Sequence, residues 1–357
     1  MKSIIINGKT ISNYDTGKLP SIKSAWDDDD RLGKPLIATA GELGITDLPA
    51  TSELVACAGV PDNHEAKIDV NPSHKFDDID LDRLLSYVIQ REWTRSDMEP
   101  RRGLLLMGST GTGKTTFIEQ RYAQRGLPLY SINADPDMMA CDLIQYRSSA
   151  NGTTYWEDGV LLKAMREGVA LYINEASVVA PAQLVALNEI VEKGKAVLPQ
   201  TGEVVRAKRG FMVHASVNGS FTEDREGGYT GLRSQNISVM TRFYLYNMRQ
   251  MSEAEEANFL AATFPKLGRP LTDRMAGFSA ATRKAHNGVG NGAVLDVAMS
   301  RRHLLAWGEA MQSMAYLQEK KIDVASYTLN FVYTNGFPED QKQAIMQMLE
   351  LSFNNPG

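Results

Sequence analysis

The sequence has few cysteines and no long apolar run. Only two of its 357 residues are cysteine, Cys57 and Cys141, so the chain lacks the cysteine density of a disulfide-stapled secreted domain. The apolar stretch near the start is too short for a signal peptide, and no run approaches the length of a membrane span. We therefore expect a protein of the reducing cytoplasm with no membrane segment.

The chain also lacks an excess of positive charge and the patterns of several catalytic classes. Its five histidines show no metal-ligand spacing, and no Gly-x-Ser-x-Gly nucleophile motif occurs. The net charge of −5 argues against a surface coated for nucleic acid, although it does not exclude a local basic patch. The aspartate run at residues 27–30 is interpreted as a solvated loop, with a metal or partner site as the alternative.

The most informative pattern in the chain is a complete G-x-x-x-x-G-K-[ST] phosphate-binding loop. The apolar run at residues 104–107 predicts a buried strand before the loop, and residues 115–125 predict a helix after it. In this setting the glycines let backbone N–H groups face phosphates, and the helix dipole favours the negative charge. The residues expected to bind nucleotide are Gly108, Ser109, Thr110, Gly111, Thr112, Gly113, Lys114, Thr115 and Thr116.

Two polar side chains of this motif have an expected partner. Lys114 would reach the β- and γ-phosphates, and the Thr115 hydroxyl would bind Mg²⁺. The motif therefore predicts ATP and Mg²⁺ as cofactors.

A second strand, at residues 169–173, ends in acidic or amide groups suited to hydrolysis. Glu175 is the candidate to orient and deprotonate the attacking water. Asn174 stands where an aspartate is expected, so it offers Mg²⁺ an oxygen without a negative charge. We expect weaker Mg²⁺ binding or slower turnover as the consequence.

The order of the predicted elements indicates an α/β fold. Strands and helices alternate between residues 104 and 245, which predicts a parallel sheet covered by helices on both faces. The expected strands lie at 129–133, 169–173 and 211–217, with a helix at 181–192. The expected domains are a poorly defined N-terminal region (1–75), a nucleotide-binding domain (76–248) with a hairpin insert near 195–207, and a helical lid (249–357).

Together these motifs resemble an AAA+ ATPase. The resemblance depends on the phosphate loop, the Tyr172–Glu175 strand end, the strand ending in Asn218, and Arg242-Phe243. The hairpin near 195–207, inserted before the strand that ends in Asn218, resembles a feature of the MoxR branch. The likeness is closest to the small, CobS-type ATPase subunit of aerobic cobalt chelatase and spans roughly residues 75–353. The further matching segments are Trp156–Leu161, Tyr229–Gly231, Gln235-Asn236 and Ser300–Arg302.

The resemblance implies roles for four further side chains. Asn218 would be the sensor-1 group between the attacking water and the γ-phosphate. Arg242 would be the arginine finger that completes the neighbouring subunit's site. Arg302 would be the sensor-2 arginine, with the adjacent Arg301 as the alternative. Asn133, at the end of the strand expected at 129–133, could restrain Glu175.

The resemblance also implies what the protein does. It implies an Mg-ATP-dependent ring, a hexamer of the same chain, that couples hydrolysis to remodelling of a partner protein. It further implies a partner with a von Willebrand factor A domain. The alternatives are a true cobalt-chelatase subunit in cobalamin synthesis and a nucleic-acid motor of a restriction system. Asn174 and the loosely matching N-terminal region weaken the first alternative, and the acidic charge balance weakens the second.

Overall fold

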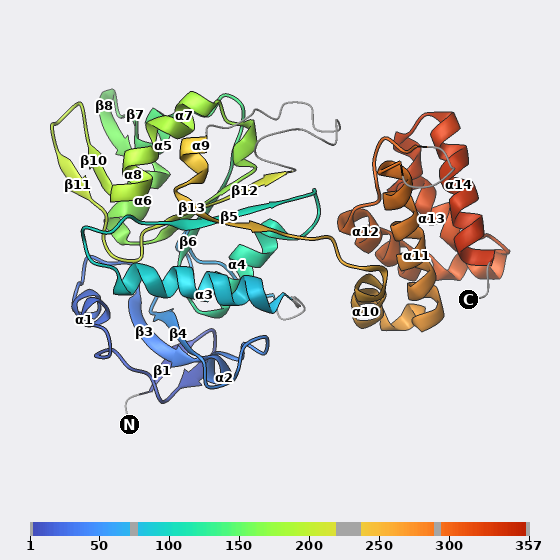
Figure 1. The fold of residues 1–357 in the computed structure, drawn as a ribbon, viewed down its shortest axis with the longest axis horizontal. Coiled ribbons are helices and arrows are strands. Elements are labelled where there is room, and N and C mark those ends of the chain that lie inside the picture. The colour runs from blue at the N-terminus through green and yellow to red at the C-terminus, as the bar shows by residue number, and fades with distance from the viewer. Residues whose placement is uncertain (1–2, 72–77, 219–236, 289–293, 355–357) are drawn as a thin grey trace. The chain divides into compact units, whose positions relative to one another are not determined.

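The computed structural model describes residues 3–71, 78–218, 237–288 and 294–354 (Figure 1). It consists of two compact units, Met1–Gly108 with Gly113–Met248 and Ser109–Thr112 with Arg249–Gly357. The Tyr229–Gly231 and Gln235-Asn236 segments lie outside the described residues. Within the described ranges, no helix has the length and apolarity of a membrane span.

A five-stranded parallel sheet forms the centre of the first unit, which confirms the predicted α/β fold. The chain passes from β5 to the edge strand β6, returns through β9 and β12, and places β13 on the far side of β5. The loop after β5 therefore lies where the strand order reverses, which is where open parallel sheets bind ligands. The strands are β5 (Gly103–Gly108), β6 (Leu129–Asn133), β9 (Ala170–Asn174), β12 (Val213–Asn218) and β13 (Phe243–Asn247).

Helices cover both faces of this sheet (Figure 1). Leu104 and Leu106 of β5 pack with α3 and α4, whereas the intervening Leu105 packs with α6 and α8. This alternation explains why the strand is apolar throughout, since both of its faces are buried. The helices of this unit outside the N-terminal region are α3 (Ile79–Thr94), α4 (Lys114–Gln124), α5 (Ala140–Ile144), α6 (Val160–Glu167), α7 (Pro181–Ala186), α8 (Asn188–Lys193) and α9 (Ile237–Met240).

The single helix predicted over 181–192 is wrong in one respect, because the chain forms two helices there, α7 and α8. At Leu187 the backbone N–H bonds the carbonyl of Leu184 rather than that of the residue four back. This tighter turn lets the buried Leu187 join the core of the sheet.

Two antiparallel hairpins extend from the same unit. The hairpin of β10 (Lys195–Val197) and β11 (Val204–Arg206) occupies the segment where an insert was expected. A second hairpin, β7 (Gln145–Ala150) with β8 (Thr153–Asp158), was not predicted from the sequence. Most of its side chains are exposed, so the strands show no apolar alternation that could reveal them.

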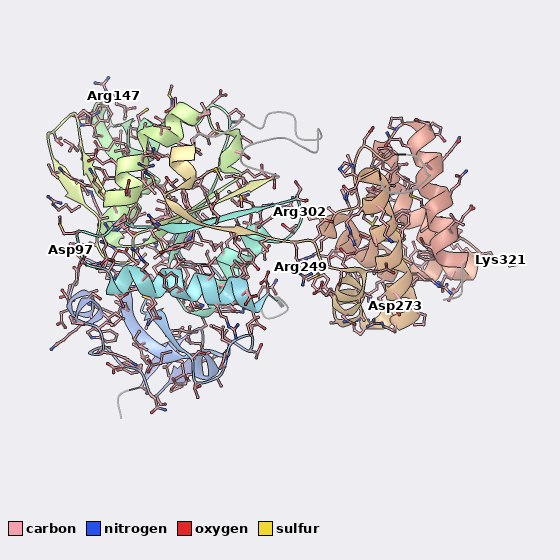
Figure 2. All side chains as sticks on the ribbon, viewed as in Figure 1. Asp97, Arg147, Arg249, Asp273, Arg302 and Lys321 are labelled. Carbon is pink, nitrogen blue, oxygen red and sulfur yellow. The ribbon has the colours of Figure 1, made fainter. Side chains whose placement is uncertain are left out.

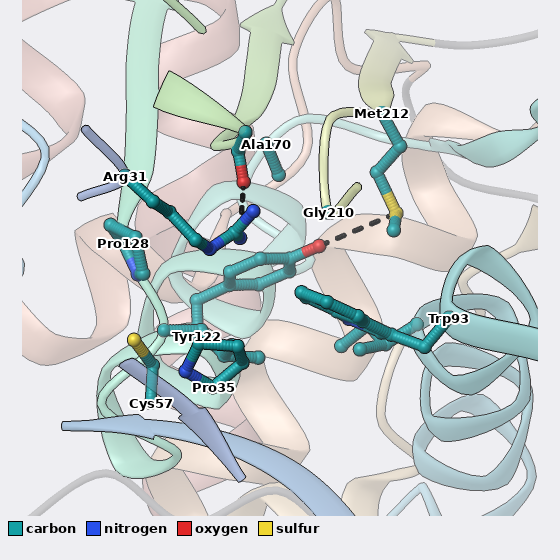
Figure 3. Close-up of a pocket in the computed structure, with 12 residues that line it drawn as sticks. Arg31, Pro35, Cys57, Trp93, Tyr122, Pro128, Ala170, Gly210 and Met212 are labelled. Atoms are coloured by element: carbon teal, nitrogen blue, oxygen red, sulfur yellow. Dashed lines mark hydrogen bonds between the residues drawn. The ribbon is translucent and has the colours of Figure 1, made fainter. Parts of the chain in front are cut away.

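The N-terminal region forms a small layer of its own beside α3. Ile11, Leu36 and Ala56 lie in its fully buried core. Its other face adjoins α3 and α4 at a cavity of about 20 Å³ lined by Arg31 and Cys57, among others (Figure 3). Its elements are β1 (Ile4–Ile6), β2 (Lys9–Ile11), α1 (Pro20–Trp26), β3 (Lys34–Thr39), α2 (Ala40–Leu43) and β4 (Glu53–Ala58).

The second unit consists of helices around a core that includes Phe278, Trp307 and Leu329. Ser252 and Glu255 form the capping box predicted from the sequence at the start of its first helix. The helices are α10 (Glu253–Thr263), α11 (Arg269–His286), α12 (Arg301–Ser313), α13 (Val324–Val332) and α14 (Glu339–Asn354).

Candidate functional site

The glycine-rich loop curls tightly between β5 and α4. Gly113 has a φ of 95° and begins α4 in a left-handed conformation that an L side chain rarely adopts. At Gly108, a Cβ would lie 2.6 Å from the carbonyl oxygen of Met248. Thr112 Oγ1 donates to the Ser109 carbonyl at 3.0 Å, which closes the loop further. The exposed Thr110 and the half-buried Gly111 lie at the tip of the loop, and Thr116 lies in the first turn of α4.

Lys114, Asn218 and Glu175 form one hydrogen-bonded chain. The buried Lys114 ammonium donates to the Gly108 carbonyl at 2.7 Å and to Asn218 Oδ1 at 2.9 Å. The Nδ2 of Asn218 donates to Glu175 Oε1 at 3.2 Å. The asparagine amide therefore links a cation to a carboxylate, which neither an aspartate nor a lysine could do at this position.

Thr115 and Asn174 form a second chain beside the first. Thr115 Oγ1 donates to Asn174 Oδ1 at 2.9 Å. Asn174 Nδ2 in turn donates to Asn133 Oδ1 at 2.9 Å. The structure therefore brings Asn133 to Asn174, while Glu175 bonds Asn218. Because its hydrogen points to Asn174, the Thr115 oxygen keeps its lone pairs for a metal ion.

Sequence reasoning missed two hydroxyl side chains of the site, Tyr172 and Ser216. The Tyr172 hydroxyl donates to Ser216 Oγ at 2.7 Å, and Ser216 Oγ donates to Asn174 Oδ1 at 2.8 Å. Burial raises the pKa of Tyr172 to about 12, so its hydroxyl stays protonated and keeps donating near neutral pH. Ser216 Oγ also accepts from the backbone N–H of Glu175 at 3.3 Å.

Strand register explains why these groups meet. Asn133 pairs with Asn174 across β6 and β9, and Asn218 pairs with Gly108 across β12 and β5. Residues two apart in a strand share a face, so Ser216 lies on the face of Asn218. A polar residue two positions before each strand-end polar residue was thus the signal available in the sequence.

Glu175 has a φ of 58°, an unusual conformation for a residue other than glycine. Such backbone conformations cost on the order of 1 kcal/mol or more and persist only where neighbouring contacts hold them. Here the contacts are those of its N–H with Ser216 and of its carboxylate with Asn218. They fix the carboxylate at the edge of the sheet beside Lys114.

The residues at this edge fit a nucleotide with Mg²⁺. The loop glycines leave room for the backbone to approach phosphates, and the buried Lys114 supplies a fixed positive charge. The hydroxyl of Thr115 is a hard oxygen donor of the kind that Mg²⁺ prefers, and the oxygen of Asn174 would serve as a second one on releasing a hydrogen bond from Thr115 or Ser216. The phosphate groups would lie at the N-terminus of α4.

Arg242 lies at the opposite end of the sheet from this site. It precedes β13, whose first residue Phe243 pairs with Gly103 at the start of β5. Gly108 ends that strand, about 17 Å further along at about 3.3 Å per residue. Arg242 Nε lies 3.1 Å from a carboxylate oxygen of Glu192. Within one chain, β5 thus separates the arginine from the phosphate loop.

Arg301 and Arg302 differ in their surroundings within the second unit. The Arg301 guanidinium lies over the ring of Phe259, 5.6 Å from its centroid, and burial lowers its pKa. The Arg302 side chain is exposed (Figure 2). Arg301 thus packs within the helical unit, whereas Arg302 is accessible.

Known proteins share the region of this site. Residues 103–233 match the AAA domain (dynein-related subfamily). The denitrification regulatory protein NirQ of Pseudomonas aeruginosa is 34% identical over 192 residues, which cover 52% of this chain and 70% of NirQ. Protein NorQ of Paracoccus denitrificans is 38% identical over 117 residues, covering 32% of this chain and 43% of NorQ.

The similarity extends to proteins from other bacteria. The uncharacterized protein YojN of Bacillus subtilis is 34% identical over 152 residues, which cover 41% of this chain and 47% of YojN. The chain spans about half the length of most of the curated relatives it matches. The phosphate loop, the strand order and these relatives agree, and the chain therefore belongs to the AAA domain family, dynein-related subfamily.

Proposed function

We propose that the protein is an Mg-ATP-dependent AAA+ ATPase of the MoxR branch. The observation that supports this most directly is the hydrogen-bonded chain from Lys114 through Asn218 to Glu175. The chain runs from the ammonium of Lys114 to Asn218 at the end of β12, and from there to the carboxylate of Glu175, which follows β9. A nucleotide-binding domain without hydrolysis would need the lysine but not the linked carboxylate.

Each residue of the site has a role in this proposal. Lys114 and the backbone N–H groups of the loop would bind the phosphates, and Thr115 with Asn174 would hold Mg²⁺. Bound Mg²⁺ would neutralise the charge that develops on the phosphate oxygens. Glu175 accepts the proton of the attacking water, and Asn218 orients that water.

We further propose that Arg242 acts on a neighbouring subunit, which requires a ring, most simply a hexamer. The register of β13 on β5 supports this, because Arg242 lies at the far end of the strand from its own phosphate loop. To act as a finger, its guanidinium must exchange the ion pair with Glu192 for the neighbour's phosphate. For sensor 2, the exposed Arg302 is favoured over Arg301, which packs on Phe259.

The proposed output is remodelling of a partner protein, with a von Willebrand factor A domain protein as the expected partner. The similarity to NirQ, a denitrification regulatory protein, is consistent with this output. A cobalt-chelatase subunit remains the second candidate, favoured by the resemblance of the Trp156–Leu161 segment. Fold membership does not choose between these outputs.

A pair of variants tests the proposed chemistry. Glu175→Gln should keep ATP affinity but lower the turnover rate by about 100-fold or more, since the proton acceptor is gone. Lys114→Ala should weaken nucleotide binding itself. The matched control is Glu189→Gln, an exposed glutamate of α8 that pairs with Lys193, and its turnover should equal the wild type. Undiminished hydrolysis by Glu175→Gln would exclude Glu175 as the base.

A further inference from the structure

A second concave site lies at the other end of the central sheet. It is a groove of about 770 Å³ between α1, the residues that follow α3, and residues 207–209. Arg101 comes just before β5 and Arg209 just before β12, the strands whose far ends hold the phosphate loop and Asn218. The groove is therefore separate from the proposed nucleotide site.

Cationic side chains dominate this groove, which we call the cationic groove. Two aspartates, Asp28 and Asp97, also line it, and Asp97 lies beside the end of α3 nearest α1 (Figure 2). The chain as a whole has a net charge of −5, so the positive charge is a local feature. The cations that line the groove are Arg31, Arg95, Arg101, Lys208 and Arg209.

Backbone carbonyls hold the buried arginines in fixed positions. Arg101 donates to the carbonyls of Phe211, Lys193 and Ala207 at 3.0 to 3.2 Å. Arg31 donates to the Gly168 carbonyl at 2.8 Å, and its guanidinium lies over the ring of Trp93, 4.9 Å from the centroid. Neutral carbonyls fix a guanidinium without cancelling its charge, so the positive potential remains in the groove.

Two observations indicate that the positive charge of the groove is not fully balanced by neighbouring groups. Arg31 Nε is buried and has no hydrogen-bond partner among the described residues. The pKa of Arg101 is lowered to about 10, by burial first and also by the charges of Arg95 and Arg209. Glu92 opposes this shift, but its single carboxylate is shared between two arginines, Arg95 and Arg101, so it balances one of their two charges.

The chain already places two carboxylates at the rim, and one of them, Asp97, pairs with Arg209. Asp28, from the aspartate run 27–30, lies 3.0 Å from Lys208 Nζ. A carboxylate is therefore accommodated by the geometry of the rim.

We propose that the cationic groove binds an acidic peptide segment, a run of Asp or Glu residues, of a partner protein. Apolar side chains on the α1 wall, including Leu19, Pro20 and Ala25, suit the stems of peptide side chains. The positive charge is confined to this groove on a chain of net charge −5, so it suits a short acidic segment rather than the extended phosphate charge of a nucleic-acid strand. This inference does not rest on the proposed ATPase.

A fluorescein-labelled octaglutamate peptide tests the proposal with the full chain and without nucleotide. Fluorescence anisotropy should show saturable binding that weakens by about tenfold or more between 50 and 300 mM salt, because the contacts are ionic. Lys208→Glu should weaken binding by about tenfold or more. Ser24→Glu, an exposed groove residue on α1, should weaken it by about threefold or more without touching a buried group.

The matched control is Lys266→Glu, which makes the same charge change at an exposed lysine of the second unit. Its affinity for the peptide should stay within about twofold of the wild type. Absence of saturable binding, or equal affinity in Ser24→Glu and wild type, would overturn the proposal. Tighter binding of a labelled oligothymidine that both groove variants weaken would assign the groove to nucleic acid instead. Because nucleotide is absent, a failed ATPase proposal would leave these outcomes unchanged.

Discussion

At the scale of single residues, the site depends on two asparagine side chains, each of which accepts a hydrogen bond and donates another. Asn218 accepts from Lys114 and donates to Glu175, and Asn174 accepts from Thr115 and donates to Asn133. In each asparagine the oxygen accepts a hydrogen bond and the nitrogen donates one. Replacing asparagine by aspartate therefore keeps the accepted bond and removes the donated one.

Asn174→Asp is expected to lower the half-saturating Mg²⁺ concentration by about fivefold, or to raise turnover. The carboxylate keeps the bond from Thr115 and adds a negative charge beside the metal. Asn133 must then turn its amide to donate to the new oxygen. The measurement is an Mg²⁺ titration of ATPase activity.

The matched control for this titration is Asn133→Asp, which adds the same charge on the neighbouring strand and keeps the bond from Asn174 Nδ2. Its effect on the half-saturating Mg²⁺ concentration should be smaller. If Asn174→Asp changes neither this concentration nor turnover, the metal does not depend on residue 174.

A buried histidine links stability of the first unit to pH. His214 Nδ1 accepts from the backbone N–H of Leu104 at 3.0 Å, and its Nε2 lies 2.6 Å from the Tyr122 hydroxyl. Burial lowers the pKa of His214 to about 3, so the folded chain keeps it neutral. The unfolded chain binds a proton near pH 6.5. Stability from this residue is therefore full above that pH and falls as the pH decreases toward 3.

From pH 7.5 to 5.5, the free energy of unfolding should fall by about 1 kcal/mol through His214 alone. His214→Asn, whose amide oxygen can still accept from Leu104, should be less stable but should lack this part of the pH dependence. Urea unfolding at the two pH values measures both slopes, and carboxylates contribute little in this range. Equal slopes in the variant and the wild type would contradict the assignment.

At the scale of elements, the approach of β5 to β12 sets the geometry of the site. A Cβ on Gly103 would collide with the backbone carbonyl of Val213, so only glycine allows this spacing. Gly103→Ala should lower the free energy of unfolding of the first unit by about 2 kcal/mol or more, because the strands must separate. Calorimetry measures the loss.

The control for this variant is Gly17→Ala, where a Cβ would meet only Asp15 Oδ1 at the ordinary distance of 3.7 Å. Its unfolding free energy should change by less than about 0.5 kcal/mol. A Gly103→Ala protein as stable as this control would mean that the strands tolerate a wider spacing.

The elements that the sequence predicts well are those with a strong apolar pattern. The strands around Leu105 and Leu171 are buried on both faces, so their composition alone indicates a parallel sheet. The β7–β8 hairpin is exposed and polar, and the helix break at Leu187 follows from tertiary packing. Neither leaves a periodic signal in the sequence.

The site follows the same rule. The phosphate loop and Glu175 could be named as candidates, because their motif and strand-end position indicate a chemistry, and the structure links them through Asn218. Tyr172 and Ser216 contribute through the register of β9 and β12, for which a polar residue two positions before the strand end is only an indirect signal. The N-terminal layer was not predicted either, since β1 and β2 have only three residues each and its strands pair only with each other among the described residues.

At the scale of the whole molecule, the central question is whether one site is built from two chains. The register of β13 places Arg242 at the far end of β5 from Gly108 in its own chain. If the arginine acts on a neighbouring subunit, Arg242→Ala disables the neighbour's site and leaves its own nucleotide contacts intact. Lys114→Ala disables only its own site. The two lesions are therefore complementary.

Mixing the two inactive variants, under conditions that allow subunits to exchange, should recover part of the ATPase activity. In a mixed ring, some interfaces join an intact Lys114 site to an intact Arg242 from the next chain. If Arg242 acted within its own chain, no recovery would occur, because no subunit would have both groups. Co-purification of differently tagged variants must show that mixed rings form. Mixed rings without activity would contradict the shared site, and a fully active Arg242→Ala protein would remove Arg242 from the mechanism.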